Sequence, residues 1–376
     1  AKDCAEMERI MSDLTCGFIG LGLIGGSIAR ALKEYNHRIR IVAYDINPDT
    51  LRLAAQDGVV DVTASAIDGS FSDCDYLFLC APVQKNDANL AAVKKILPEK
   101  CLLTDVGSVK STIHEAIRAA GLEHCFIGGH PMAGSERVGY INSKASLLEN
   151  AYYILTPTSS VPADRLEAYR ALVEKLGAIP LILDYEKHDY ITAAISHLPH
   201  VIAASLVNLV RDSDSEDGIM RLVAAGGFKD ITRIASSSAA MWQQICLTNG
   251  GNISTLLQSY IDSLTAIKSE IDGNQADALY TLFDSARIYR DSFINASSGP
   301  IKRSFSFNVD IADKSGSLSR IVALLANHRL SIKNIGITHN RESEDGVLRI
   351  EFYDAAAMET AVSILEATGY SVHLRS

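Results

Sequence analysis

Short apolar runs alternate with helix-patterned segments over the first half of this 376-residue chain. Between residues 16 and 184, apolar runs of strand length are separated by stretches whose apolar residues recur at helical spacing. Strands that alternate with helices in this way are joined by crossover connections, so the pattern predicts an α/β fold, a mostly parallel sheet with helices on both faces. The expected strands cover residues 17–19, 39–44, 76–80, 101–104, 125–127, 152–155 and 180–183.

The rest of the chain predicts two further domains. Strand signals stop after residue 184, and residues 185–298 have the pattern of several long helices rich in alanine, leucine, isoleucine and serine. We expect an all-α domain this apolar to bury one face against a partner, which favours a homodimer. After a linker-like Ser-Ser-Gly-Pro at 297–300, residues 299–376 follow the order βαββαβ, which is typical of a small separate domain.

One apolar stretch, residues 191–210, is long enough to cross a membrane. It contains His197, Pro199 and His200, and polar groups are costly at the middle of a bilayer. We therefore expect a buried helix of a soluble protein and no membrane partner. The first residues are charged and have no apolar run, so we also expect no signal peptide and a cytoplasmic location.

Charge and cysteine content narrow the class of protein further. Lys and Arg number 35 against 45 Asp and Glu, a net charge of −10, and nucleic-acid binding needs the opposite excess. The 7 cysteines are scattered, with no C-x-x-C pair, which predicts free thiols in a reducing compartment. His197 and His200 are spaced to share a helix face, but no H-E-x-x-H pattern accompanies them, so we expect no metal site.

A glycine-rich turn follows the first expected strand. Gly20, Gly22 and Gly25 form G-x-G-x-x-G where a strand turns into a helix, which lets backbone N–H groups approach a pyrophosphate. Asp45 ends the second strand, where its carboxylate can accept hydrogen bonds from ribose hydroxyls and repel a 2′-phosphate. These features predict a Rossmann-type dinucleotide-binding domain over residues 1–184, with NAD rather than NADP as cofactor. The predicted cofactor-binding residues are Gly20, Gly22, Leu23, Ile24, Gly25, Asp45, Ala81 and Pro82.

Polar residues follow two later strands at the same expected sheet edge. His130 is held between Gly129 and Pro131 at a strand end, and an imidazole with an ordinary pKa near ~6.5 can accept a proton at neutral pH. Ser108 follows the preceding strand and could orient the ring. The alternative for His130 is a loop histidine that caps backbone groups.

In the helical region, Arg233 is a candidate for binding a carboxylate, because its planar fork bonds both oxygens. The alternative is that Arg233 only forms an ion pair on the protein surface.

Several motifs together resemble a known family. They are Asp-Val-Gly-Ser-Val-Lys at 105–110, His-Pro-Met-Ala-Gly-Ser-Glu at 130–136, His-Leu-Pro-His at 197–200, Lys-Asp-Ile-Thr-Arg at 229–233 and Met-Trp at 241–242. With the glycine turn, they make nearly the whole chain similar to prephenate dehydrogenases, the NAD-dependent bacterial enzymes of tyrosine biosynthesis. The last 75 or so residues resemble an ACT domain, a regulatory module.

The resemblance implies a reaction and a set of roles. The reaction is the oxidative decarboxylation of prephenate to 4-hydroxyphenylpyruvate, with His130 accepting the ring hydroxyl proton and Ser108 orienting His130. Arg233 would hold a substrate carboxylate. The other residues that the resemblance places near the substrate are His200 at its side chain, His197, Ser135, Glu136 as a gate, Asp230 in support of Arg233, and Trp242 from the neighbouring subunit.

The resemblance of residues 299–376 to an ACT domain implies an amino-acid effector. We expect L-tyrosine to bind there as a feedback inhibitor, through Asp313, Gly316, Leu318 and Asn334. A purely structural dimerising module is the alternative.

Three other functions remain open at this point. Arogenate dehydrogenase acts on a substrate in which an amino group replaces the side-chain keto oxygen, and His200 slightly favours the keto acid over this amino acid. A dehydrogenase of the β-hydroxyacid type would need a catalytic lysine instead of the histidine motif. A non-catalytic sensor would bind NAD and an amino acid without producing NADH.

Overall fold

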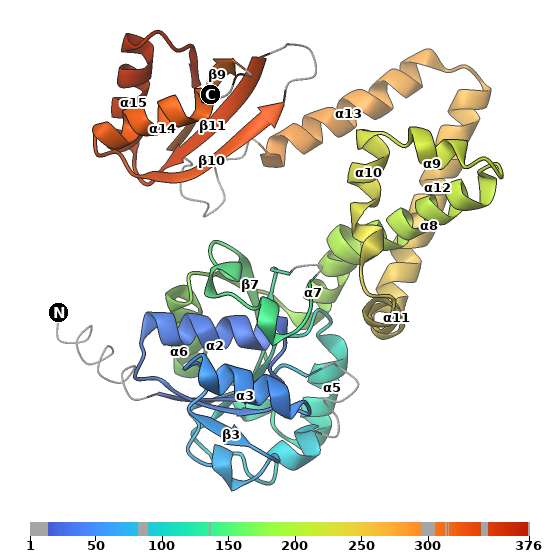
Figure 1. Cartoon of the computed structure of the whole chain (residues 1–376). Helices are drawn as coiled ribbons and strands as arrows, with labels where there is room; N and C mark the ends of the chain where they lie inside the picture. The colour runs from blue at the N-terminus through green and yellow to red at the C-terminus, as the bar shows by residue number, and fades with distance from the viewer. Residues whose placement is uncertain are drawn as a thin grey trace. The chain divides into compact units, whose positions relative to one another are not determined.

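The computed structural model describes residues 14–81, 89–134, 137–294, 305–312, 314, 316–339 and 345–374. The chain forms two compact units, the first ending at Thr281 and the second beginning at Leu282. Each unit is described by itself below (Figure 1). The predicted domain boundary between residues 298 and 299 lies outside the described residues and stays a prediction.

An eight-stranded sheet forms the centre of the first unit. Its order is β3-β2-β1-β4-β5-β6-β7-β8, and all neighbouring strands are parallel except the antiparallel pair β6 and β7. The first six strands follow the order of dinucleotide-binding folds, which confirms the predicted α/β class. The strands are β1 Thr15–Ile19, β2 Arg40–Tyr44, β3 Val62–Ala64, β4 Tyr76–Leu79, β5 Leu102–Asp105, β6 Phe126–Pro131, β7 Tyr152–Pro157 and β8 Ile179–Ile182.

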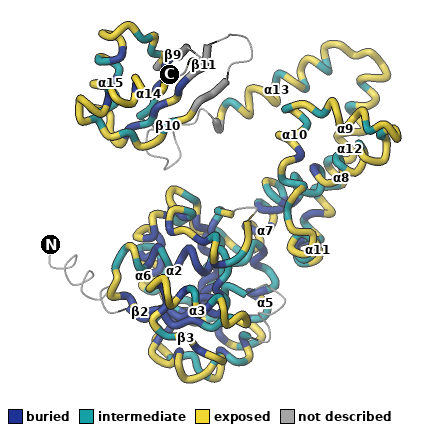
Figure 2. The backbone as a smooth tube through the Cα atoms, viewed as in Figure 1, coloured by how far each residue is buried: buried dark blue, intermediate teal, exposed yellow. Residues whose placement is uncertain are grey.

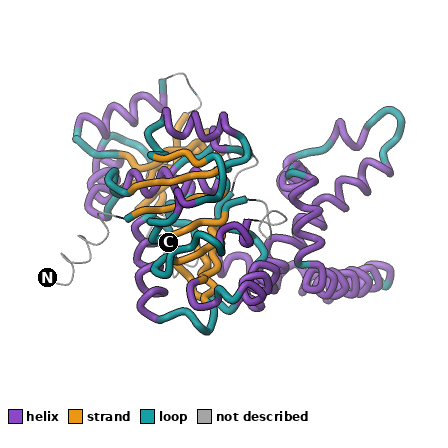
Figure 3. Tube along the Cα trace, turned by 90° about the horizontal axis from the view of Figure 1, so that it is seen from below, coloured by secondary structure: helices purple, strands orange, loops and turns teal. Residues whose placement is uncertain are grey.

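Helices cover both faces of this sheet (Figure 3). On one face, α2 (Leu23–Tyr35), α3 (Pro48–Gln56) and α6 (Ala163–Lys175) pack on a core that includes Phe18 and Phe78. On the other face, α5 (Ser111–Ala120) packs on a core that includes Ile19 and Leu103. Because successive strand residues point to opposite faces, neighbours such as Phe18 and Ile19 enter different cores. The six described cysteines are free thiols, as predicted for them.

The helical part of the first unit begins with one long helix after β8. This helix runs through α7 (Tyr185–Thr192), a π-helical turn (Ala193–His197) and α8 (Leu198–Ser213). Asp184 caps its start by accepting hydrogen bonds from the N–H groups of Glu186 and Lys187. The helices that follow are α9 Ile219–Val223, α10 Gly226–Thr232, α11 Ala239–Thr248, α12 Gly250–Asp272 and α13 Ala276–Ile294, the last of which continues past the end of the unit.

The prediction of a buried helix over residues 191–210 was wrong for the single chain. The helix Tyr185–Ser213 is long and apolar enough to span a membrane, but only 17% of its most apolar window is buried. The helical part has a small core of its own, centred on Ala193, Ile245 and Ile253, and most of its surface is exposed (Figure 2). The sequence pattern shows which face is apolar but not which surface covers it.

The second unit contains the four remaining strands of the described chain. They form an antiparallel sheet of order β10-β11-β9-β12, with a core under α14 and α15. The elements, in chain order, are β9 Phe305–Ala312, α14 Ser317–Asn327, β10 Ile332–His339, β11 Asp345–Phe352, α15 Ala355–Ala367 and β12 Val372–Leu374. The predicted βαββαβ order is therefore confirmed.

Candidate active site

The glycine turn packs tightly on one side and is open on the other. Gly20 has a positive φ of 94°, and a Cβ there would lie 2.8 Å from the backbone nitrogen of Ala81. A Cβ on Gly25 would lie 2.9 Å from the carbonyl oxygen of Gly20. By contrast, a Cβ on Gly22 would meet no described atom within 4 Å, and no side chain caps the start of α2 there. This open, uncapped helix start fits the pyrophosphate of a dinucleotide.

Asp45 lies directly beside this turn at the end of β2. Its Oδ2 accepts a hydrogen bond of 2.7 Å from the Leu21 N–H, and its Oδ1 accepts one of 2.8 Å from the Asn47 N–H. The carboxylate is only partly buried and keeps lone pairs for a ribose. Leu23 and Ile24 begin α2, and Ala81 follows β4 at the same edge. Pro82 lies outside the described residues.

His130 projects from β6 and is hydrogen-bonded at one nitrogen only among the described residues. Its Nδ1 lies 2.8 Å from Nε2 of His188, and the two rings meet edge to face, with centroids 5.0 Å apart. Burial, with contributions from His188 and Lys110, holds the pKa of the His130 imidazole well below its ordinary value. The ring is therefore neutral at pH 7 and can accept a proton.

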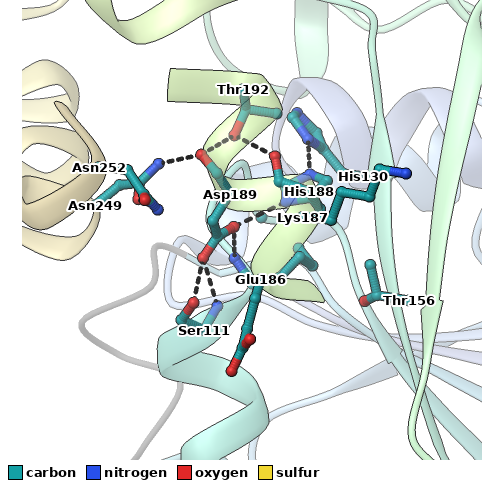
Figure 4. Close-up of polar contacts among 12 residues, drawn as sticks. Ser111, His130, Thr156, Glu186, Lys187, His188, Asp189, Thr192, Asn249 and Asn252 are labelled. Carbon is teal, nitrogen blue, oxygen red and sulfur yellow. Dashed lines mark hydrogen bonds and ion pairs between the residues drawn. The ribbon is translucent and has the colours of Figure 1, made fainter. Parts of the chain in front are cut away.

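The carboxylate of Asp189 contacts the nitrogen of His188 that does not face His130. Nδ1 of His188 is 2.8 Å from Oδ1 of Asp189, and both residues are completely buried. Asp189 also accepts hydrogen bonds from the N–H groups of Lys110 and Ser111 and from the Ser111 hydroxyl, at 2.7, 2.8 and 2.5 Å (Figure 4). These hydrogen bonds keep the pKa of Asp189 below its ordinary value despite its burial.

A buried ion pair supports the strand that carries His130. Lys110 and Asp105 are paired by their side chains at 0% and 1% exposure. The Lys110 Nζ also donates a hydrogen bond of 2.7 Å to the Gly129 carbonyl, and the Gly129 N–H donates one of 3.2 Å to Asp105. The pair therefore ties the end of β5 to the residue immediately before His130.

The long helix and α11 form a second group of rings. His200 stacks on Trp242 with centroids 3.7 Å apart, and His197 meets the same indole edge-on at 6.0 Å. His197 is held through Nδ1 by the Asn249 side chain, which also donates to the Asp189 carbonyl, at 3.1 and 2.8 Å. Burial lowers the pKa of His197 to about 4, and burial and the charge of Arg233 both lower that of His200. His200 and Trp242 line a groove of about 780 Å³ in the helical part.

The structure departs from one expected role. Ser108 was expected to orient His130, but His188 occupies Nδ1 of the imidazole, while Ser108 lies in the bend after β5. Asp230 is exposed on α10, one turn before Arg233, which is also exposed. The Trp242 Nε1 atom is buried and has no hydrogen-bond partner among the described residues. Ser135 and Glu136 lie outside the described residues.

Sequence reasoning missed His188, Asp189 and Asn249, and it noted Lys110 in the motif at 105–110 without giving it a role. His188 is 58 positions from His130, and no local motif links them, because the contact arises only when α7 returns to the edge of the sheet. The available signal was a His-Asp pair at the start of a long apolar helix that directly follows the last strand.

The fold and this site define a class of enzyme. A dinucleotide-type sheet brings a glycine turn, an acid after β2 and a neutral imidazole to one edge, which is the arrangement of a nicotinamide-dependent dehydrogenase. Two family models then match the chain. Residues 28–181 match the nucleotide-binding domain of prephenate dehydrogenase, and residues 184–285 match its dimerization domain.

Individual relatives agree with this match. The chain is 36% identical to the prephenate dehydrogenase of Bacillus subtilis over 93% of its own length and 94% of the relative's. A crystal structure of the Aquifex aeolicus prephenate dehydrogenase with hydroxyphenyl propionate and NAD⁺ is 31% identical, with a TM-score of 0.70, over 74% of this chain and 98% of that one. For a Synechocystis arogenate dehydrogenase, the identity is 28% and the TM-score 0.67, over 74% of this chain and 100% of that one.

The chain therefore belongs to the prephenate dehydrogenase family. It is an NAD-dependent dehydrogenase, and the reaction of its family is the oxidative decarboxylation of prephenate.

Proposed function

We propose that this enzyme oxidises prephenate in preference to arogenate, with His130 as the base. Prephenate is a cyclohexadienol with two carboxylates. A hydride leaves its ring carbinol carbon while the base takes the hydroxyl proton, which makes that carbon a carbonyl. Loss of CO₂ then sends its bonding electrons into the ring, and the oxygen takes a proton back, which gives the aromatic ring of 4-hydroxyphenylpyruvate. NAD⁺, when bound, supplies the hydride acceptor. The residues of the chain have to hold the substrate in line and take the hydroxyl proton.

A neutral imidazole at the carboxyl edge of the sheet is the observation that carries this proposal. His130 has its Nδ1 occupied by His188, which leaves Nε2 for the substrate hydroxyl. Its depressed pKa keeps the ring unprotonated at neutral pH, as a general base must be. Ser108, in the bend after the neighbouring strand, is proposed to contact the same hydroxyl.

The helical part is proposed to supply the substrate contacts. Arg233 would bind a carboxylate, because its positive charge already acts on His200 beside it. His200 would face the keto acid side chain, and His197 would lie between His200 and His130, because His200 contributes to the lowered pKa of His197 and His197 to that of His130. We also propose contacts from Ser135 and Glu136, whose positions are not described, and support for Arg233 from Asp230.

Arg233→Ala is expected to raise the Michaelis constant for prephenate by about 10- to 100-fold, because a charge-assisted hydrogen bond is worth roughly 1.5–3 kcal/mol. The kcat should change by much less, because the proposed contact is with a carboxylate and not with the carbinol carbon that is oxidised. Steady-state kinetics at saturating NAD⁺ measures both constants, with Arg221→Ala as a control from the exposed α9. An unchanged Michaelis constant in the Arg233 variant contradicts the proposed role.

The preference for prephenate rests on the charges near the groove. His200 and Arg233 suit a keto acid, whereas the ammonium group of arogenate would need a carboxylate. Asp212, the described carboxylate that lines the groove, is already paired with Arg211 at 2.8 Å. Formation of NADH is to be followed with prephenate and arogenate, each with NAD⁺ and NADP⁺. We expect the highest kcat/KM for prephenate with NAD⁺, because Asp45 repels a 2′-phosphate. A higher kcat/KM with arogenate would reverse the assignment.

We propose that the helical part pairs two copies into a homodimer in the cytoplasm. The family match over residues 184–285 is to a dimerization domain. Large apolar side chains of this part are exposed in the single chain, with Leu222 at 77%, Val223 at 66% and Leu209 at 62%. A second copy would cover such a surface, and the buried hydrogen bonds of His188 and Asp189 on the same long helix favour this over a membrane span. In such a dimer Trp242 could contribute to the neighbouring site.

For the C-terminal unit, we propose that it is an ACT-like module that binds L-tyrosine and inhibits the enzyme. Gly316 caps α14 with a positive φ of 88°, and no described atom lies within 4 Å of where its Cβ would be. Leu318 is partly exposed on α14 and Asn334 is exposed on β10, while Asp313 lies outside the described residues.

Calorimetry is expected to detect binding of L-tyrosine to the full-length enzyme, and tyrosine should reduce NADH formation. Gly316→Val should weaken this binding by at least about tenfold, because a β-branched residue is strained at positive φ and fills the open space. The matched control is Gly369→Val, at a positive φ of 89° in the same unit, after α15. The absence of tyrosine binding to the unmodified enzyme refutes the proposal.

A further inference from the structure

A continuous line of hydrogen bonds runs from His130 into the interior. Nδ1 of His130 meets Nε2 of His188 at 2.8 Å, and Nδ1 of His188 meets Oδ1 of Asp189 at 2.8 Å. Figure 4 shows His188 between the other two, with Asp189 directed toward the start of α5. His188 and Asp189 are completely buried, so no bulk solvent competes for these hydrogen bonds.

The groups that donate hydrogen bonds to Asp189 show that it is ionised, and this decides which nitrogen of His188 carries a proton. Its two oxygens face two backbone N–H groups, of Lys110 and Ser111, and the Ser111 hydroxyl. Backbone N–H groups can only donate, so Asp189 is an ionised acceptor at both oxygens. The nitrogen of His188 that faces Oδ1 must therefore carry its proton.

The tautomer of His188 in turn fixes the tautomer of His130. A neutral imidazole has one N–H and one lone pair, so His188 with its proton on Nδ1 can only accept at Nε2. His130 must then donate through Nδ1, which leaves the lone pair on its Nε2. A fixed carboxylate thus selects the nitrogen of His130 that acts as the base.

We propose that His188 and Asp189 are positioning residues that fix the lone pair of His130 on Nε2 and share the positive charge that forms there. This inference rests on the proposed role of His130 as the base. When Nε2 takes the hydroxyl proton, the proton on Nδ1 of His130 can move to Nε2 of His188. One N–H bond breaks as the other forms, and the positive charge then lies next to the Asp189 carboxylate.

Other charged groups around His130 do not offer this path. Lys110 faces the ring from the start of α5 and is paired with Asp105. His197 faces it from the long helix, but its Nδ1 is bound to the Asn249 amide. Among the described groups that act on His130, Asp189 is the one that favours its positive charge, and it does so through His188.

The first test is the tautomer of His130 in the unmodified full-length enzyme. Nitrogen NMR of histidine-labelled protein at pH 7 distinguishes a protonated from an unprotonated ring nitrogen, with His130→Asn used to assign the signal. We expect a protonated Nδ1 and an unprotonated Nε2. A protonated Nε2 overturns the inference without any appeal to activity.

The second test compares two replacements of His188. Glutamine can accept the Nδ1 hydrogen bond through its amide oxygen but cannot take a proton, whereas leucine can do neither. We expect kcat to fall by about tenfold for His188→Gln and by about 100-fold or more for His188→Leu, while the Michaelis constant for prephenate and the Kd of NAD⁺ stay within about twofold. The His130 tautomer should persist in the glutamine variant and be lost in the leucine variant.

The control and the outcomes separate the two proposals. His114 is another buried imidazole, with a hydrogen bond of 2.9 Å to Thr156. If the loss of kcat comes from the contacts of His188 and not from the replacement of any buried histidine, His114→Gln should leave kcat unchanged. Equal losses of kcat in the glutamine and leucine variants, with wild-type tautomers in both, contradict the positioning role. Full turnover in His130→Asn removes the base itself, and the tautomer measurement then still decides whether His188 orients the ring.

Discussion

Replacing His130 by asparagine is expected to lower kcat by about 10²–10⁴-fold, the usual range for loss of a general base. Asparagine keeps a polar side chain of similar size, so the Michaelis constant for prephenate and the Kd of NAD⁺ should stay within about twofold. Steady-state kinetics and a cofactor titration by fluorescence measure these quantities, with His114→Gln as the matched variant. If the asparagine enzyme turns over at the wild-type rate, His130 has no part in proton transfer.

The pH dependence of the unmodified enzyme provides a companion measurement. His130 has a pKa well below its ordinary value because of burial and the neighbouring His188, Lys110 and His197, with Asp189 opposing them. A base works in its unprotonated form, and a lowered pKa keeps that form populated to lower pH. We therefore expect kcat/KM to hold its value as the pH falls through ~6.5 and to decline only well below it. A decline centred near ~6.5 would mean that the ring is not buried during catalysis.

The second large effect concerns stability. Lys110→Met is expected to lower the free energy of unfolding of the nucleotide-binding part by about 3–5 kcal/mol, because it leaves the Asp105 carboxylate buried without its partner. Urea unfolding followed by circular dichroism measures this difference. Activity should fall as well, since the Lys110–Asp105 pair anchors Gly129 immediately before His130.

Two further variants show whether the uncompensated charge is the cause. Adding Asp105→Asn to Lys110→Met removes that charge and should recover part of the lost stability. Lys268→Met breaks an exposed pair with Asp272 on α12 and should change the free energy of unfolding by no more than the error of the measurement. Equal losses in the Lys110 and Lys268 variants would contradict an electrostatic origin.

The sequence was most informative where chemistry requires a local pattern. The glycine turn, the acid after β2 and His130 at the end of β6 each depend on a few adjacent residues, and the structure brings the turn and Asp45 into direct contact. The sheet was also predictable, apart from β3, which is only three residues long and too short to show a pattern. Because βα units repeat, each strand could be recognised by the helix that follows it.

The rest depended on contacts between distant segments. The residues near Ser108 and His130 in the sequence do not indicate that His188, rather than Ser108, is hydrogen-bonded to Nδ1 of His130. That contact depends on where the helix after β8 meets the edge of the sheet. The burial of residues 191–210 failed as a prediction for a related reason. An apolar face is visible in a sequence, but the surface that covers it lies elsewhere, and in the single chain most of this helix is exposed.

The π-helical turn within the long helix has a mechanical consequence. It separates His188 and Asp189, which continue the hydrogen-bond line behind His130, from His200, which lines the groove, and its own last residue is His197. All four residues lie on one continuous helix. The Leu198 N–H closes the wide turn by donating to the Ala193 carbonyl, and Pro199 follows with no N–H to restore the tighter spacing. Each residue of an α-helix advances the chain by about 100°. The length of this segment therefore sets the angle about the helix axis between His188 and His200. One residue more or less would turn His200 by about 100° relative to His188.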